Sequence, residues 1–191
     1  MADTAQKLMT IEEFFVWQQG QEERFELVDG EPVKLMTGAS EVHDVVVLNI
    51  ASSLHGQLRG KPCRAATADL AVRTKIRSLR RADVLVTCDG DPPRADSYAA
   101  RNPRMVVEVL SPSNHGSTWD RKLKEYRRLS GLVYILIVDP QAEQAIFLRK
   151  AGEQWQHEDY DGRDGVIALP DIECLLAMAD VYDGLPPPAG A

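Results

Sequence analysis

The chain has 191 residues, of which 44% are apolar and 27% are charged. This length and composition are typical of one soluble globular domain with a complete core. The longest apolar run, near Leu132 to Val138, is too short to cross a bilayer, and the N-terminus lacks the pattern of a signal peptide. These features argue against a membrane partner and favour a cytoplasmic location.

The three cysteines are Cys63, Cys88 and Cys174. They are far apart, odd in number and without the spacing of metal ligands. The sequence therefore predicts reduced thiols that serve as small core residues in a cytoplasmic protein.

The net charge of −7 conceals two regions of opposite sign. Residues 59–128 contain 16 Lys or Arg and 8 Asp or Glu, so this part carries +8 and the remainder −15. A basic region in an acidic protein is expected where one face binds a polyanion such as a nucleic acid. The alternative is that these cations only decorate solvated faces.

The N-terminal part predicts a helix followed by a hairpin. Thr10 and Glu13 form a capping box, and the helix should end near Gly20. The strings RFELV and EPVKLM flank Asp29-Gly30, which is a strong hairpin signal. Glu26 lies between two apolar residues of the first strand, so the alternation predicts an exposed strand carboxylate.

A second helix should run from about Glu41 to Leu58, with Ser40 as its N-cap. Its apolar side chains fall on two neighbouring faces, and periodicity does not decide which one is buried. One face holds Val45, Leu48, Ala51 or Ser52, and His55, and the other holds Val42, Val46, Asn49 and Ser53. His43 lies in the first turn, where a histidine is more often a solvated or capping side chain than a ligand.

Three short strands, CRAATAD, LAVRT and ADVLVT, should follow, with residues 75–81 as a basic turn between the last two. After a Pro- and Asp-rich loop over residues 89–103, RMVVEVL is typical of a buried strand. Asp83 begins one of these apolar runs and Glu108 lies inside another. A buried carboxylate is costly unless a cation or donor meets it, so the pair indicates a site.

The next helix, from Thr118 to about Ser130, has the most informative periodicity. With about 100° between successive residues, Lys122 falls between Leu129 and Tyr126 on the apolar arc. Arg121, Lys124 and Arg128 fall on the opposite face. An inward lysine needs an anion nearby, or its side chain snorkels to bring the ammonium group into water.

The C-terminal part predicts a strand at VYILIVDP, a hairpin from AIFLRK and EQWQHEDY with an acidic outer face, and a short closing helix from Pro170. One domain over residues 1–184 and a disordered tail over 185–191 are expected. The order of elements indicates an α/β fold with one mixed central sheet.

Asp83, Glu108 and Lys122 together suffice for metal-dependent phosphodiester hydrolysis. Two carboxylates bind a hard cation such as Mg²⁺ or Mn²⁺, and a lysine stabilises charge at the phosphate or positions water. The sequence has no Gly-rich phosphate loop, no serine nucleophile elbow and no His and Cys metal spacing. Buried acids in structural ion pairs are the alternative explanation.

Five ordered strings carry a resemblance that covers about residues 10 to 180: RFELVDGE, SEVHDVVVLNIASSL, RRADVLVTC, MVVEVLSPS and WDRKLKEYRRL. They resemble the Uma-type bacterial family of restriction-endonuclease-like proteins, within the PD-(D/E)XK nuclease superfamily. The resemblance implies a restriction-endonuclease-like core: a mixed sheet flanked by helices, with acids on adjacent central strands.

The resemblance also implies roles for individual residues. The superfamily acids fall on Asp83, preceded by Ala instead of the usual Pro, and on Glu108. Leu110 stands where the superfamily lysine is usual, and the family's lysine falls on Lys122, with Tyr126 one turn later. Two further positions match without a firm role: Glu26 as an auxiliary ligand or supporting group, and His43.

The expected function is therefore a Mg²⁺-dependent DNA endonuclease that acts on double-stranded DNA. A homodimer would suit this reaction, because two strands need two cuts. Asp83 and Glu108 would bind metal and Lys122 would assist the attacking water. Nucleic-acid contacts are expected from the basic turn, namely Lys75, Arg77, Arg80 and Arg81. The alternative is a catalytically degenerate nuclease fold that binds nucleic acid or protein without turnover.

Overall fold

The computed structural model describes residues 8–35, 40–90, 92–111 and 117–186. Within these ranges the helices are α1 (Ile11–Gln18), α2 (Glu41–Leu58), α3 (Ser117–Arg127), α4 (Met178–Val181) and the 3₁₀ turn η1 (Pro170–Ile172). The α/β class with a mixed central sheet flanked by helices is confirmed, and the described strands add two smaller sheets to the central one. None of the described helices is long and apolar enough to cross a membrane.

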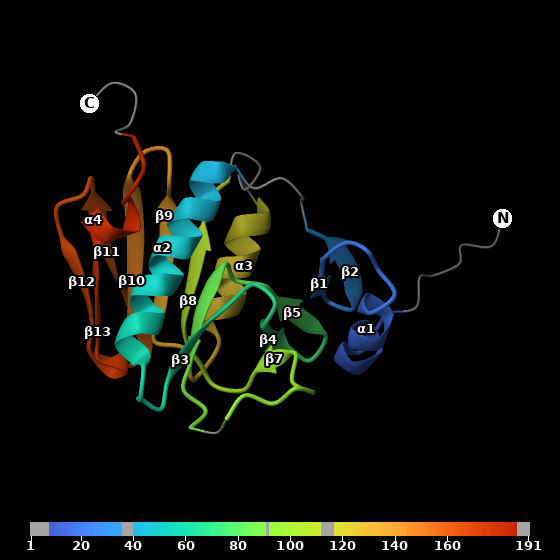
Figure 1. Cartoon of the computed structure of the whole chain (residues 1–191). Coiled ribbons are helices and arrows are strands. Elements are labelled where there is room, and N and C mark those ends of the chain that lie inside the picture. The colour runs from blue at the N-terminus through green and yellow to red at the C-terminus, as the bar shows by residue number, and fades with distance from the viewer. Residues whose placement is uncertain (1–7, 36–39, 91, 112–116, 187–191) are drawn as a thin grey trace.

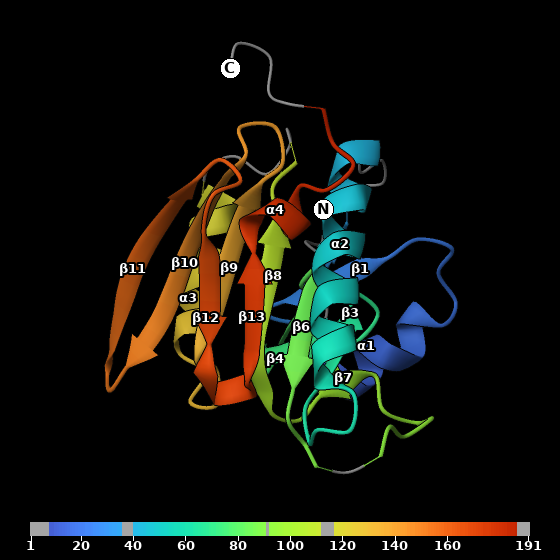
Figure 2. The same ribbon diagram turned by 60° about the vertical axis from the view of Figure 1, so that its left-hand side comes forward.

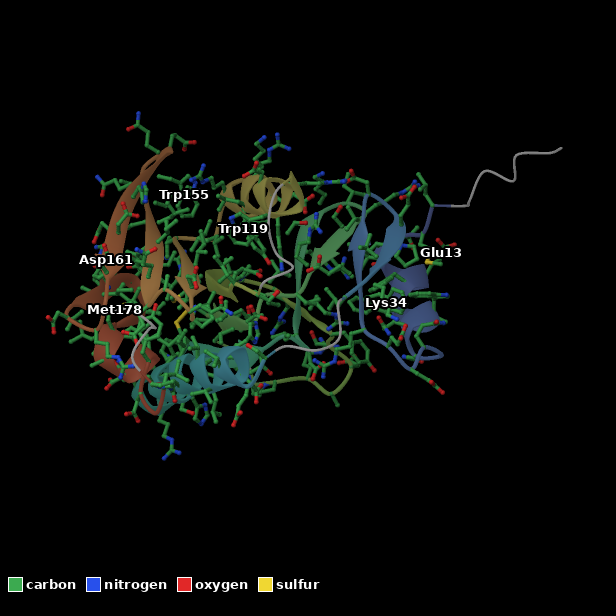
Figure 3. All side chains as sticks on the ribbon, turned by 90° about the horizontal axis from the view of Figure 1, so that it is seen from above. Glu13, Lys34, Trp119, Trp155, Asp161 and Met178 are labelled. Atoms are coloured by element: carbon green, nitrogen blue, oxygen red, sulfur yellow. A yellow bond between two sulfur atoms is a disulfide. The ribbon has the colours of Figure 1, made fainter. Side chains whose placement is uncertain are left out.

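The largest sheet has six strands in the order β11-β10-β9-β8-β6-β3. Their bounds are β3 (Arg64–Thr67), β6 (Val84–Thr87), β8 (Pro103–Val109), β9 (Tyr134–Asp139), β10 (Gln144–Ala151) and β11 (Gln154–Asp161). The β8–β9 pair is parallel and the other pairs are antiparallel, which makes the sheet mixed. Helices α2 and α3 cover opposite faces of this sheet, as the view from above shows (Figure 3).

The two faces of the large sheet have separate cores. Val84, Val86 and Val107 pack with the inner side of α2, whereas Leu85 and Val106 pack with Tyr126 of α3. Side chains alternate between the faces of a strand, and both faces are covered, so β6 and β8 are almost continuously apolar. Glu108 is the exception.

A second sheet of five strands lies beside the first, in the order β2-β1-β5-β4-β7. Its strands are β1 (Phe25–Val28), β2 (Glu31–Lys34), β4 (Ala71–Lys75), β5 (Ser78–Arg80) and β7 (Ala99–Ala100). The predicted N-terminal hairpin is confirmed, and α1, β1 and β2 lie at one end of the molecule, with β11 to β13 at the other (Figure 1). The predicted basic turn contains β5, so only Ile76 and Arg77 form the turn itself.

The C-terminal segment differs from the prediction. In place of a closing helix, β12 (Val166–Leu169) and β13 (Cys174–Ala177) form a hairpin whose turn includes η1, and α4 follows. Ile167, Leu169 and Leu176 are buried in the core beside α2. Buried and exposed side chains therefore alternate along both strands of the hairpin. Figure 2 shows this hairpin beside α2. Leu185 still packs against this core, whereas residues 187–191 of the predicted tail lie outside the described residues.

Helix α2 begins and ends where the sequence predicts, and Ser40 Oγ accepts a hydrogen bond from the amide of His43. Its buried residues are Val46, Ile50, Leu54 and Leu58. Neither predicted face matches this stripe fully. Leu48 of the first face is exposed, and Val46 is the buried member of the second.

Cys63 and Cys88 form a disulfide that connects the residue before β3 to the residue after β6. The prediction of three reduced thiols is therefore wrong, because the antiparallel pairing of these strands brings together two cysteines that are distant in sequence. Cys174 is a buried free thiol, as predicted. The cysteines no longer support a cytoplasmic location.

Candidate active site

Asp83 directly precedes β6, and Glu108 lies in the neighbouring strand β8 of the large sheet. The β6–β8 register pairs Val84 with Val107, and its extension by one residue places Asp83 opposite Glu108. Glu108 is buried at 4% exposure, while Asp83 Oδ2 accepts a hydrogen bond from the amide of Val109 at 2.8 Å. Antiparallel pairing thus brings two carboxylates, 25 positions apart in sequence, to one end of the sheet.

Helix α3 brings an amine and a phenol to Glu108. Lys122 Nζ lies 2.7 Å from Glu108 Oε1 and 2.8 Å from Oε2, and the Tyr126 hydroxyl donates to Oε1 at 2.7 Å. Lys122 Nζ also donates to the carbonyl of Arg81 at 3.0 Å. The inward orientation of Lys122 that the helical periodicity indicates is confirmed, and its side chain is 13% exposed.

The environment changes the protonation of these groups. Burial raises the pKa of Glu108 to about 7, with the negative charge of Asp83 adding to the shift and Lys122 opposing it. Burial by itself would lower the pKa of Lys122, but the Glu108 and Glu26 carboxylates raise it above its ordinary value. The pKa of the Tyr126 hydroxyl is raised by burial and by Glu108. Lys122 and Tyr126 therefore remain protonated donors at neutral pH.

Glu26 joins the same pocket from β1. Its Oε1 lies 3.3 Å from Lys122 Nζ and accepts the amide of Arg81 at 2.8 Å, and its Oε2 accepts Arg80 at 2.9 Å. These cations hold the pKa of Glu26 below its ordinary value although burial opposes them. The prediction of an exposed strand carboxylate is wrong, because Arg80 of β5 and Lys122 of α3 meet the buried Glu26 side chain.

Arg80 is a buried structural cation. Its guanidinium makes two hydrogen bonds to Glu125, at 2.8 and 3.0 Å, besides the one to Glu26, and it is 2% exposed. The prediction that Arg80 contacts nucleic acid is therefore wrong, because both of its charge partners are inside the protein. Breaking such a pair by removing one partner typically costs about 3–5 kcal/mol.

Glu125 and Thr74 belong to this network, but the sequence analysis missed them. Thr74 Oγ1 donates to Glu125 Oε2 at 2.8 Å, and Arg80 and Thr74 lower the pKa of Glu125 to about 2 against the effect of burial. The available signal was helical spacing, since Glu125 lies one turn after Lys122 on nearly the same face. No local pattern identifies Arg80 as its partner.

The three other basic residues expected to bind nucleic acid have different surroundings. Arg81 is half-buried and donates to the carbonyls of Phe25, Ala68 and Asp69, so its guanidinium supports the backbone. Lys75 is partly exposed and pairs with Asp29 at 3.0 Å and Glu125 at 3.3 Å. Arg77 is exposed at the β4–β5 turn.

His43 lies beside Asp83, and not in solvent as its position in the first helical turn indicates. Its Nε2 is 3.6 Å from Asp83 Oδ2, its side chain is 13% exposed, and its buried Nδ1 has no hydrogen-bond partner. The interaction with the Asp83 carboxylate is the main cause that raises the pKa of His43. The fold thus brings four of the other five predicted catalytic and supporting residues around Glu108, with His43 beside Asp83.

The oxygen ligands of this pocket fit a hard divalent cation. Mg²⁺ commonly uses one or two carboxylates and keeps several waters, so Asp83 and Glu108 are a sufficient protein contribution. Over the described part of the chain, no group of three or more His, Cys, Asp or Glu side chains has a metal-binding arrangement. Lys122 now contacts both oxygens of Glu108, so a cation would share this carboxylate with the ammonium group.

Comparison with known proteins assigns the family. The family model described as "Uma2: Putative restriction endonuclease" matches residues 11–179. The chain belongs to the Uma2 family. Two Synechocystis relatives of this Uma2-family chain are each described as an uncharacterized protein. The match to slr1290 has 27% identity and covers 91% of each chain. The match to sll1609 has 25% identity and covers 84% of this chain and 92% of sll1609.

A solved structure shares the fold. The crystal structure of a "putative nuclease belonging to DUF820" from Anabaena variabilis superposes with a TM-score of 0.69 at 19% identity. The match covers 91% of the Uma2-family chain and 97% of the Anabaena chain. This agreement confirms the expected α/β nuclease-like fold.

Proposed function

We propose that this Uma2-family protein is a Mg²⁺-dependent endonuclease that hydrolyses phosphodiester bonds of double-stranded DNA. The observation that carries the proposal is the position of Lys122 Nζ, 2.7 Å from Glu108, in a pocket that also holds Asp83. The family description and the shared nuclease-like fold support the same reaction class.

Each residue of the pocket has a role that follows from its contacts. Asp83 and Glu108 would hold the cation, which when bound makes coordinated water more acidic and neutralises charge on the phosphate. Lys122 is a protonated donor, so it would stabilise the negative charge that develops on the phosphate oxygens. Tyr126 orients the Glu108 carboxylate, and Glu26 holds Lys122 from the opposite side.

The proposal is tested by nicking of supercoiled plasmid with Mg²⁺ or Mn²⁺, against an EDTA control. Asp83→Ala and Lys122→Met should abolish nicking while far-ultraviolet circular dichroism remains that of the wild type. Matched controls are Glu153→Ala in the exposed β10–β11 turn and Lys34→Met on β2, which should cleave normally. Full nicking by Asp83→Ala would refute the assignment.

A second function is favoured by a specific observation. Lys122 and Tyr126 already engage Glu108, which leaves fewer free carboxylate oxygens than a metal-rich nuclease site offers. A nuclease fold that binds nucleic acid or protein without turnover would show metal-independent DNA binding and no nicking with either metal.

A homodimer is expected only for the enzyme, because cutting two strands needs two sites, and light scattering in the presence of DNA would test it.

A further inference from the structure

The turn between β4 and β5 has an unusual residue at its tip. Lys75 pairs with Ser78, so Ile76 and Arg77 form a two-residue hairpin turn. Ile76 is 92% exposed, more than any other large apolar side chain in the described part of the chain. An apolar side chain held in water contributes nothing to folding through burial.

Two other hairpins show what such turns ordinarily contain. The β1–β2 turn is Asp29-Gly30 and the β10–β11 turn is Gly152-Glu153, both with positive-φ residues suited to a tight turn. Ile76 and Arg77 do not have positive φ. Turn geometry therefore does not explain the isoleucine, and its position at the tip points to a contact outside the chain.

The turn is fixed in place before any partner arrives. The Arg77 carbonyl accepts the amide of Gly30 at 2.8 Å, and Asp29 accepts Lys75 at 3.0 Å and Ser78 Oγ at 3.2 Å. A preorganised apolar tip loses little conformational entropy on binding.

The surroundings of the tip are basic. Ile76 lies between Lys75 and Arg77. A shallow groove of about 310 Å³ begins at Lys75 and is lined by three further cations, two on α3 and one directly after it. These cations are Arg121, Lys124 and Arg128, and the groove also includes Asp120 and Glu125. Lys75 and Arg121 share Glu125 with Arg80, and the four cations of the groove still outnumber its two acids, so a phosphate backbone fits it electrostatically.

The tip is also close to the candidate active site along one strand. The Arg81 carbonyl, just after β5, accepts Lys122 Nζ, and Ile76 lies five residues earlier. At about 3.3 Å per residue this is roughly 17 Å, or about five base-pair steps of DNA. One duplex can therefore contact both places. Figure 1 shows β4 and β5 between the large sheet and the N-terminal elements.

We propose that Ile76 is a wedge that inserts between base pairs of double-stranded DNA and kinks it, while Arg77 and the α3 cations hold the phosphates. The inference rests on the proposed function for its substrate. Apolar wedges flanked by cations partially unstack a base step and bend the duplex by about 20–90°. Lys75 and Arg77 would supply the sequence-independent affinity, and Ile76 the distortion.

The test uses the full-length protein and a 30-base-pair duplex with a fluorophore pair on its two ends, in Ca²⁺ to prevent turnover. Wild-type protein should raise the energy-transfer efficiency, because a kink shortens the end-to-end distance. Ile76→Ser should bind about tenfold more weakly, because the apolar burial is lost. The duplex saturated with this variant should show the same energy-transfer efficiency as free DNA. Arg77→Ala should reduce the slope of log affinity against log salt concentration by about one. DNA saturated with this variant should remain kinked.

Leu175→Ser is the matched control, because Leu175 is 57% exposed on β13, at the other end of the molecule. It should change neither binding nor energy transfer. An unchanged kink in Ile76→Ser would overturn the inference, as would a wild-type complex without any kink. Loss of a homodimer in Ile76→Ser, seen by light scattering, would identify a second copy as the partner and overturn it too. Plasmid nicking by the wild type separates these failures from failure of the proposed function.

Discussion

Strand β8 faces two different environments, and the contrast shows how the protein separates stability from chemistry. Val107 and Val109 point to the α2 face and pack in its apolar core with Val46, Ile50 and Leu54. Glu108, between them, points to the α3 face and meets Lys122 and Tyr126. The first face stabilises the fold by burial. The second holds charges that are costly to bury unless each has its partner.

The largest expected effect separates the two faces. If Glu108 holds the cation as proposed, Glu108→Gln should reduce plasmid nicking by about 10²–10³-fold, because the carboxylate charge is lost while the shape is kept. Thermal unfolding should show that the variant is folded, because Glu26 remains as a charge partner of Lys122. Normal nicking by this variant would mean that the α3 face is only structural.

Arg80→Met tests whether the polar face depends on its own internal pairing. The substitution leaves Glu26 and Glu125 without their shared cation, and we expect a loss of about 3–5 kcal/mol in the free energy of unfolding. Urea denaturation measures it. The exposed cation change Lys34→Met is the control. A loss below 1 kcal/mol would show that the two acids find other partners.

Leu54→Ala tests the apolar face. Leu54 is fully buried in the α2 core, and its truncation should cost about 2–5 kcal/mol. Nicking per folded molecule, measured well below the unfolding midpoint, should be unchanged. A specific loss of nicking would show that the two faces are coupled.

The pH dependence of stability reports on Glu125. Its pKa in the folded protein is lowered to about 2, below the unfolded value near 4.5. A lowered folded pKa contributes stability that is present above about pH 4.5 and is lost as the pH falls toward 2. Urea unfolding at pH 6 and pH 3 should therefore show a decrease on the order of 2 kcal/mol in the wild type, and a smaller decrease in Glu125→Gln. Equal decreases in both proteins would contradict this assignment.

Local pattern predicted most elements and one key side-chain direction. The capping box at Thr10, the bounds of α2 and the Asp29-Gly30 hairpin are encoded within a few residues, so they were readable. The periodicity of α3 separated Lys122 from Lys124 for the same reason. The segment from Pro170 was misread as a helix because a short apolar run fits either period until its strand partner is known.

The sequence by itself determined the α/β class, the two strand carboxylates and the inward lysine, because strand and helix periods are local properties of the chain. Only the tertiary structure decided that Glu26 and Arg80 are buried together, that Glu125 completes their network, and that Cys63 meets Cys88. Those outcomes depend on which strands pair and which helix covers them. A charged residue on a strand has the same local pattern whether its face meets water or an opposite charge.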